Sequence, residues 1–219
     1  MTQLNYKGIP VETDAPLDDM VGRLEESRAG FLQKAAIFGG GVAAVASGAM
    51  AFPSTARASK ASDAEILNFA LTLEYLEASF YAIAVDKAPL DNRARRLARV
   101  IRDHELAHVD ALVKTIRDLG GTPIRRPEFQ FLPNVVYANQ QAFLQTAMAL
   151  EDTGVGAYNG AGPALTVMAV KAAAASIVAV EGMHAAWVRG VAGTAPAPEA
   201  FDPLLTKEQV LAAAGPFIA

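Results

Sequence analysis

Two copies of a Glu-x-x-His pattern are the residues of this chain best suited to chemistry. Glu105 and His108 form one copy, and Glu181 and His184 form the other. Residues three apart share a face of an α-helix, so each pair can present a carboxylate and an imidazole to the same point. Oxygen and nitrogen ligands of these types suit iron and manganese. The pattern therefore predicts metal binding.

A further glutamate accompanies each copy at a matching distance. Glu74 lies 31 residues before Glu105, and Glu151 lies 30 residues before Glu181. In both cases a leucine precedes the glutamate and a tyrosine follows it seven residues later, the tyrosines being Tyr81 and Tyr158. The same pattern thus occurs twice, which predicts a pseudo-twofold arrangement with one set of ligands from each half.

These charged residues interrupt apolar helix faces. Glu105 and His108 fall within a stripe that otherwise holds Leu97, Ile101 and Leu112. Ionised carboxylates in an apolar interior repel one another, and the desolvation of each unpaired charge costs on the order of several kcal/mol. No Lys or Arg falls in these stripes to compensate them. Two divalent metal ions would match the charge of four glutamates.

Helical periodicity continues almost throughout the chain after Ser62. Ser62 and Glu65 have the pattern of a capping box that opens the first helix. A segment of about twenty residues rich in Pro and aromatic side chains, 122–141, follows the second helix and predicts a long crossover. The expected helices cover residues 62–86, 91–119, 138–159 and 164–190, with a short last helix at 207–214. The fold class is therefore all-α, a four-helix bundle.

Four sequence runs resemble the motifs of the ferritin-like superfamily, and specifically its exported branch that includes desiccation-related proteins. The runs are LEYLEA at 73–78, DHELAH at 103–108, LEDTGVGAY at 150–158 and EGMHAAW at 181–187. The resemblance extends from Ser62 to the C-terminus and implies a ferritin-like bundle with a crossover between its second and third helices. It also implies that Glu105 and Glu181 bridge two metal ions, that Glu74 and Glu151 bind terminally, and that His108 and His184 each ligate one ion.

Several polar neighbours of these residues are expected to have other roles. Glu77 also lies near the inward face, but it aligns with Gly154 in the second copy, so an outer position beside the ligands is expected. His104 and Asp152 are adjacent to ligands in sequence and point about 100° away, towards the surface or an outer layer of the site. The two tyrosines of the repeat fit a role in the core as well as a hydrogen bond to a carboxylate.

Composition limits the remaining possibilities. The chain has 219 residues, no cysteine and a net charge of −4. Disulfides and thiolate ligands are therefore excluded, and the acidic balance predicts no nucleic-acid partner. We expect a leader at 1–58, a bundle at 59–190 and a C-terminal tail with a short helix at 191–219.

The leader has features of an export signal. Residues 35–53 carry no charge and resemble the apolar region of a signal peptide. Ala56-Arg57-Ala58, which follows, resembles a small-residue cleavage site. Ser27 to Leu32 resembles the twin-arginine motif, with Ala29 in place of the second arginine. We expect cleavage after Ala58 and a periplasmic or extracellular location. The alternative is attachment to a membrane through 35–53, with the bundle facing outside.

Three hypotheses for function follow. The first is a di-iron oxidoreductase, a ferroxidase or oxidase, that reacts with oxygen or peroxide. The second is a di-manganese, catalase-like enzyme. The third is a non-catalytic, exported stress or desiccation protein that binds metal. No catalytic group beyond the ligands and no organic cofactor is predicted, and the sequence leaves the oligomeric state open.

Overall fold

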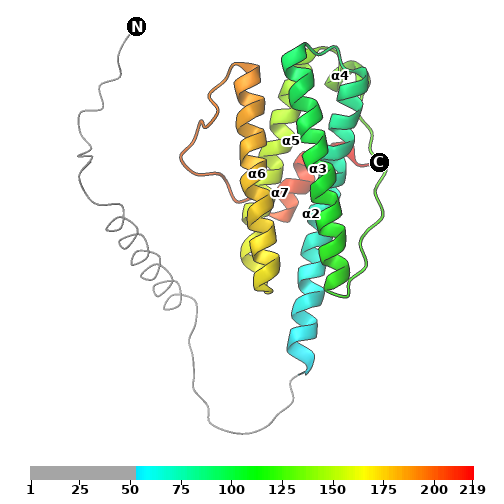
Figure 1. Ribbon diagram of the computed structural model, residues 1–219, viewed down its shortest axis with the longest axis vertical. Helices are drawn as coiled ribbons and strands as arrows, with labels where there is room; N and C mark the ends of the chain where they lie inside the picture. Colours follow the sequence, from blue (N-terminus) through cyan, green and yellow to red (C-terminus); the bar gives the residue numbers. More distant parts are fainter. Residues whose placement is uncertain (1–52) are drawn as a thin grey trace, which may run out of the picture. The chain divides into compact units, whose positions relative to one another are not determined.

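A computed structural model describes residues 53–219 of the chain, and its main feature is a bundle of four long α-helices (Figure 1). These are α2 (Pro53–Lys87), α3 (Asn92–Asp118), α5 (Gln140–Ala161) and α6 (Met168–Ala192). α2 packs against α3 and α5 packs against α6, so the bundle consists of two helical hairpins. The predicted all-α four-helix bundle is confirmed.

The first helix begins earlier than predicted. α2 starts at Pro53, and Ser62 lies inside it, so the predicted capping box of Ser62 and Glu65 is wrong. Proline is favoured in the first turn of a helix, and the Ser, Ala, Arg and Lys residues that follow it permit helix to continue. The apolar segment 35–53 falls almost wholly outside the described residues, as does most of the leader predicted at 1–58. The predicted cleavage point after Ala58 lies within α2.

The second helix has the ends that its sequence predicts. Asp91 caps α3 by accepting a hydrogen bond of 2.8 Å from the backbone N–H of Ala94. α3 stops before Gly120, whose φ of 82° is a left-handed conformation that glycine adopts without strain. Asp91 also accepts a hydrogen bond of 3.0 Å from Gln140, which ties the start of α3 to the start of α5.

The fourth helix starts later than predicted because a carboxylate from the other hairpin caps it. Residues Gly162–Ala164 form a 3₁₀ turn, η1, and α6 begins at Met168. Asp63 of α2 is fully buried and accepts hydrogen bonds of 2.8 Å from the backbone N–H groups of Thr166 and Val167. A carboxylate is stabilising at a helix N-terminus, where backbone donors are otherwise unpaired.

Asp63→Ala is therefore expected to lower the free energy of unfolding of the metal-free protein by about 2–3 kcal/mol. The alanine removes a buried acceptor and leaves the backbone N–H groups of Thr166 and Val167, just before α6, unpaired. Equilibrium unfolding in urea measures the loss. Glu65→Ala on the same helix is the control, because Glu65 is exposed and its replacement should change stability by less than about 0.5 kcal/mol. Equal effects of the two substitutions would contradict this role of Asp63.

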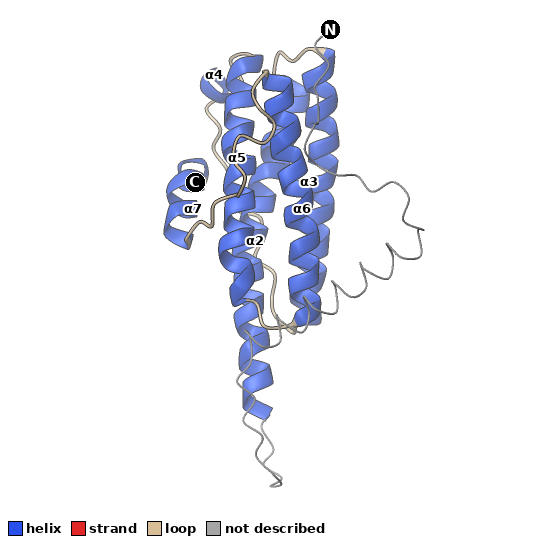
Figure 2. Cartoon of the chain, turned by 90° about the vertical axis from the view of Figure 1, so that its left-hand side faces the viewer, coloured by secondary structure: helices blue, strands red, loops and turns tan. Residues whose placement is uncertain are grey.

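The crossover and the C-terminal tail cover one side of the bundle (Figure 2). The crossover contains one turn of helix, α4 (Pro133–Val136), and Phe129 pairs with Ile218 in an isolated β-bridge. The last helix, α7 (Lys207–Ala214), has the predicted bounds and packs against α5. Leu205, just before α7, donates a backbone hydrogen bond of 2.9 Å to Gly156 of α5.

Two apolar clusters fill the bundle, one around Phe80 and Phe143 and the other around Leu71 and Ile116. On each of the four long helices, buried glutamates or histidines lie between the residues of one cluster and those of the other. The core is thus divided by a polar layer that all four long helices supply.

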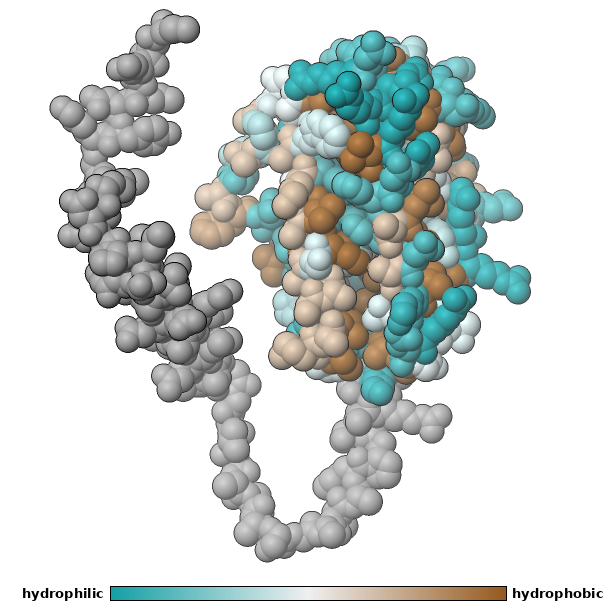
Figure 3. Space-filling model, viewed as in Figure 1, coloured by the Kyte–Doolittle hydropathy of each residue, from teal (hydrophilic) through white to brown (hydrophobic). Residues whose placement is uncertain are grey.

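α6 is more apolar than the other helices. Figure 3 shows brown and tan residues along part of the side of the bundle where α6 lies. Met168 and Met183 of α6 are 76% and 67% exposed. Among the described residues, only α6 is long and apolar enough to cross a membrane by length and composition. Its packing against α5 and its buried Glu181 fit a bundle helix, because core helices of soluble proteins pass the same test.

Candidate metal centre

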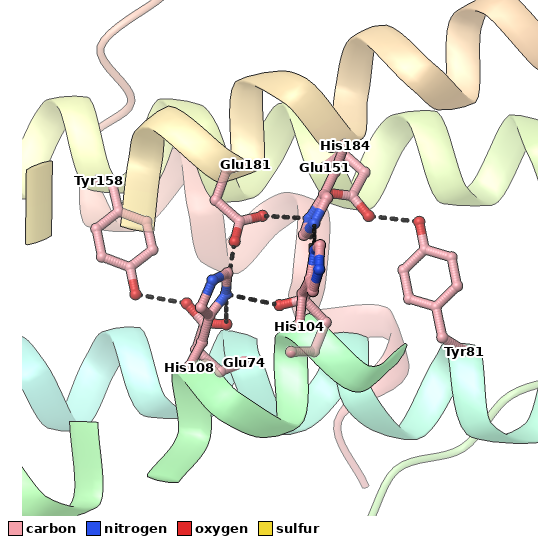
Figure 4. Close-up of polar contacts among 9 residues, drawn as sticks. Glu74, Tyr81, His104, His108, Glu151, Tyr158, Glu181 and His184 are labelled. Atoms are coloured by element: carbon pink, nitrogen blue, oxygen red, sulfur yellow. Dashed lines mark hydrogen bonds and ion pairs between the residues drawn. The ribbon is translucent and has the colours of Figure 1, made fainter. Parts of the chain in front are cut away.

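The structure brings all six predicted ligands together in the middle of the bundle (Figure 4). The residues form two overlapping groups of glutamates and histidines. In each group the potential ligand atoms lie within 4.8 Å of one another. The first group is Glu74, Glu105, His108 and Glu181, and the second is Glu105, Glu151, Glu181 and His184. Every residue in both groups is buried, so these clusters of glutamate and histidine can bind metal ions.

Glu105 and Glu181 belong to both groups because each directs one oxygen to each histidine. Glu105 Oε2 lies 3.2 Å from Nδ1 of His108, and its Oε1 lies 3.0 Å from Nδ1 of His184. Glu181 Oε1 lies 2.9 Å from Nδ1 of His108, and its Oε2 lies 3.7 Å from Nδ1 of His184. This is the arrangement expected of carboxylates that bridge two metal ions.

Glu74 and Glu151 each belong to one group only. Glu74 Oε2 lies 3.2 Å from Nδ1 of His108, and Glu151 Oε2 lies 3.4 Å from Nδ1 of His184. The two groups are therefore built alike, each from one histidine, one terminal glutamate and one oxygen of each shared glutamate. The duplication in the sequence corresponds to this duplication in space.

The two tyrosines hold the terminal glutamates. The hydroxyl of Tyr158 on α5 donates to Oε1 of Glu74 on α2 at 2.5 Å, and that of Tyr81 on α2 donates to Oε1 of Glu151 on α5. Figure 4 shows the tyrosines at opposite ends of the cluster. Each hydrogen bond fixes one carboxylate oxygen and leaves Oε2 directed at a histidine. The tyrosines are thus both core residues and hydrogen-bond partners of the site.

His104 and Asp152 lie outside the two groups, as predicted. The exposed His104 places its Nδ1 2.9 Å from Nε2 of His184, on the side of that ring away from the carboxylates. Partial burial and the charges of His184 and His108 lower the pKa of His104. Asp152 pairs with Arg189 of α6. The contact of His104 with a ligand across the bundle had no signal in the sequence beyond its position next to Glu105.

Burial and mutual contacts shift the pKa values of the site residues strongly. Burial raises the pKa of Glu105 well above its usual value, and the charge of Glu181 raises it further. Burial also acts to raise the pKa of Glu181, but its contacts with His108 and His184 outweigh this and lower it to about 2. Burial opposes protonation of the two histidines, yet their contacts with the glutamates raise each pKa to about 12. In the metal-free chain both imidazoles therefore hold protons that partly balance the carboxylates.

Buried atoms without hydrogen bonds fit a metal better than they fit a protein core. Several of these atoms lie within ion-pair distance of one another, but within the described part of the chain no hydrogen bond of acceptable geometry is found for Oε1 of Glu105, Oε2 of Glu151, either oxygen of Glu181 or Nδ1 of His184. Such atoms are rare because each buried unpaired polar group costs about 1–3 kcal/mol. A cation between them would satisfy all of them, and a set of carboxylates and imidazoles suits iron or manganese.

Metal binding is expected to compete with protons, because a histidine ligand must be neutral. The pKa values of His108 and His184 are raised from 6.5 to about 12 in the metal-free fold, so their protons stabilise it fully below pH 6.5. That stabilisation is lost as pH rises towards 12. Between pH 6.5 and 9 the thermal midpoint of chelator-treated protein should therefore fall, while the additional stabilisation by metal should grow. Thermal unfolding followed by circular dichroism measures both, and a midpoint that rises with pH without metal would contradict the assignment.

Comparison with known families agrees with this geometry. A family model described as a ferritin-like domain matches residues 62–194, a range that includes all six residues of the two groups. No curated protein matches the chain. Because the family match covers more than half of the sequence and coincides with the four-helix bundle, this chain belongs to the ferritin-like domain family.

Proposed function

We propose that the chain binds two iron ions through Glu74, Glu105, His108, Glu151, Glu181 and His184, and that it is an oxidoreductase acting on oxygen or peroxide. The observation that carries this proposal is the division of Glu105 and Glu181 between the two groups. Each places one oxygen beside His108 and the other beside His184. A single ion would not require two carboxylates shared in this way. An iron pair in such a set supplies electrons for the reduction of oxygen or peroxide.

The residues of the chain have separable roles in this proposal. Glu105 and Glu181 would hold both ions, and each histidine would hold one of them. Tyr81 and Tyr158 hold Oε1 of the terminal glutamates, so that Oε2 remains directed inward. His104 Nδ1, in contact with Nε2 of His184, connects a buried ligand to the solvent and can accept or return a proton at that atom.

Burial of the site restricts the substrate. The six residues are at most 9% exposed, which favours a small substrate over a bulky organic one. Oxygen and peroxide are small enough to reach a site of this kind through fluctuations of the bundle. Electrons can reach it by transfer through the protein.

The proposed reaction is tested by adding Fe(II) anaerobically to purified protein and then admitting oxygen. Fe(II) oxidation should be faster than in a Glu105→Ala control at the same iron concentration. Manganese suits the same ligands, so protein loaded with Mn(II) should also be assayed for peroxide disproportionation. Rapid peroxide breakdown with manganese and no effect on Fe(II) oxidation would replace the di-iron proposal by a di-manganese one. Metal binding without either activity would indicate a stress or desiccation protein that only holds metal.

We also propose that the protein acts outside the cytoplasm. The proposal rests on the charge-free segment 35–53 and on the small residues Ala56 and Ala58. N-terminal sequencing of protein recovered from the producing cells tests it. A mature chain starting at Ser59 supports export with cleavage, an intact chain in the membrane fraction supports an anchor at 35–53, and an intact soluble chain contradicts both.

A further inference from the structure

A fifth carboxylate, that of Glu77, lies buried beside the two groups without belonging to either. Glu77 is on α2, between Glu74 and Tyr81, and is 3% exposed. Burial raises its pKa well above the usual value, and the charges of four carboxylates, those of Glu181, Glu105, Glu151 and Glu74, raise it further. The polar layer around the two groups thus contains one more carboxylate than the proposed ligand set uses.

Gly154 provides the space in which Glu77 lies. A Cβ atom added to Gly154 would be 3.2 Å from Oε1 and 3.7 Å from Oε2 of Glu77. Gly154 is also the residue that aligns with Glu77 in the second copy of the sequence repeat. The carboxylate therefore exists in one half only, and it occupies the volume that its missing counterpart leaves. The pseudo-twofold symmetry of the six other residues is broken at this point.

The surroundings of Gly154 place Glu77 nearer to one half of the centre. The same Cβ position would be 3.6 Å from Oε2 of Glu181, and this oxygen is the one that faces His184. The charge of Glu151, the terminal glutamate of the second group, also raises the pKa of Glu77 more than the charge of Glu74 does. Both relations associate Glu77 with the group of Glu151 and His184.

Charge balance gives this location a consequence. Two divalent ions would balance the four glutamates of the six residues, so ionisation of a fifth buried carboxylate would be stabilised by proximity to a metal ion. An ion beside Glu77 would in turn be bound more tightly than one without it. The number and arrangement of carboxylates thus differ between the two metal positions.

We propose that Glu77 is a supplementary carboxylate of the metal position formed by Glu151 and His184, so that the two positions bind metal with unequal affinity. This inference rests on the metal centre proposed above. Glu77 acts on the ion either by approaching it directly or through its charge, and both require the side chain to be ionised when metal is bound. A residue that served only to fill the space beside Gly154 would have no effect on metal affinity.

Titration of metal-free protein with Mn(II), followed by the electron paramagnetic resonance signal of the free ion, tests the inference. Wild-type protein should bind about two ions per chain in two resolved steps. Glu77→Gln keeps the shape of the side chain and removes its charge, and it should weaken the tighter step by about tenfold or more, so that the steps converge. Glu65→Gln is the matched control, since it removes an exposed carboxylate from the same helix and should leave both steps within about twofold of wild type.

The outcomes separate this inference from the metal centre itself. Two ions bound by Glu77→Gln with unchanged affinities would overturn the role of Glu77 and leave the centre intact. Absence of Mn(II) binding by wild-type protein would overturn the centre and the inference together. Gly154→Ala is a second variant, which keeps all carboxylates and introduces a methyl group 3.2 Å from Oε1 of Glu77. It should weaken the same step, and if Glu77→Gln does not fold, unchanged binding by Gly154→Ala overturns the inference.

Discussion

Protein in which Glu105 is replaced by alanine is expected to lose most of its bound metal, and protein in which His184 is replaced is expected to lose about half. Glu105 supplies one oxygen to each group, so Glu105→Ala removes a ligand from both proposed metal positions at once. His184→Ala removes the only imidazole of the second group. Loss of a ligand from a site of four is expected to weaken binding by at least about 100-fold, because even residues behind the ligands contribute 10–100-fold. Metal content after dialysis, measured by inductively coupled plasma mass spectrometry, should fall from about two ions per chain to less than one in Glu105→Ala and to about one in His184→Ala.

Two controls distinguish lost ligands from lost fold. Asp103→Asn removes an exposed carboxylate from the same region of α3 and should retain wild-type metal content. Circular dichroism should show that both alanine variants remain helical when metal-free, because removing a buried charged group also removes its desolvation cost. Unchanged metal stoichiometry in both Glu105→Ala and His184→Ala would refute the assignment of these residues as ligands.

Gly160→Ala is expected to cause a large loss of stability although it lies outside the metal centre. A Cβ atom at position 160 would lie 2.0 Å from the backbone oxygen of Leu205, much closer than non-bonded atoms approach. The segment before α7 would have to move away from α5, and with it the hydrogen bond between Leu205 and Gly156. We expect the free energy of unfolding of metal-free protein to fall by about 2–3 kcal/mol, as for overpacked interiors. Urea unfolding followed by circular dichroism measures this change.

Gly182→Ala is the matched control for this prediction. Gly182 is also a glycine within a long helix, α6, but no atom lies within 4 Å of the position of an added Cβ. Alanine there should stabilise the protein by about 0.5–1 kcal/mol through its higher helix propensity. The two identical substitutions should therefore have opposite signs. A stabilising Gly160→Ala would show that the segment around Leu205 does not pack on α5 as described.

Much of the site could be predicted because its residues violate the pattern around them. Glutamates and histidines within apolar helical stripes imply inward charges, and the repetition of the pattern implies that the inward charges meet. Glu74 and Glu151 were distinguished from neighbours such as Glu77 by this repetition alone. The six residues that the sequence predicted as ligands are the six that form the two groups of the structure.

Other features depend on contacts between distant parts of the chain, which local patterns do not encode. Asp63 lies next to Ser62, the predicted cap of its own helix, but in the fold it caps α6 more than a hundred residues later. The close approach of Leu205 to Gly160 likewise depends on the course of a loop. Helix starts are the least accurate prediction. The start of α6 depends on a tertiary contact with Asp63, whereas α2 begins at a proline within the segment predicted as the leader.

The measurement that tests the central claim most directly is the metal content of protein purified without added metal and without a nickel column. Inductively coupled plasma mass spectrometry should find about two iron or manganese ions per chain, and the identity of the metal would favour iron or manganese chemistry accordingly. Protein that contains no metal and takes up neither Fe(II) nor Mn(II) under anaerobic conditions would contradict the account. The buried glutamates and histidines would then belong to a bundle that has no metal centre.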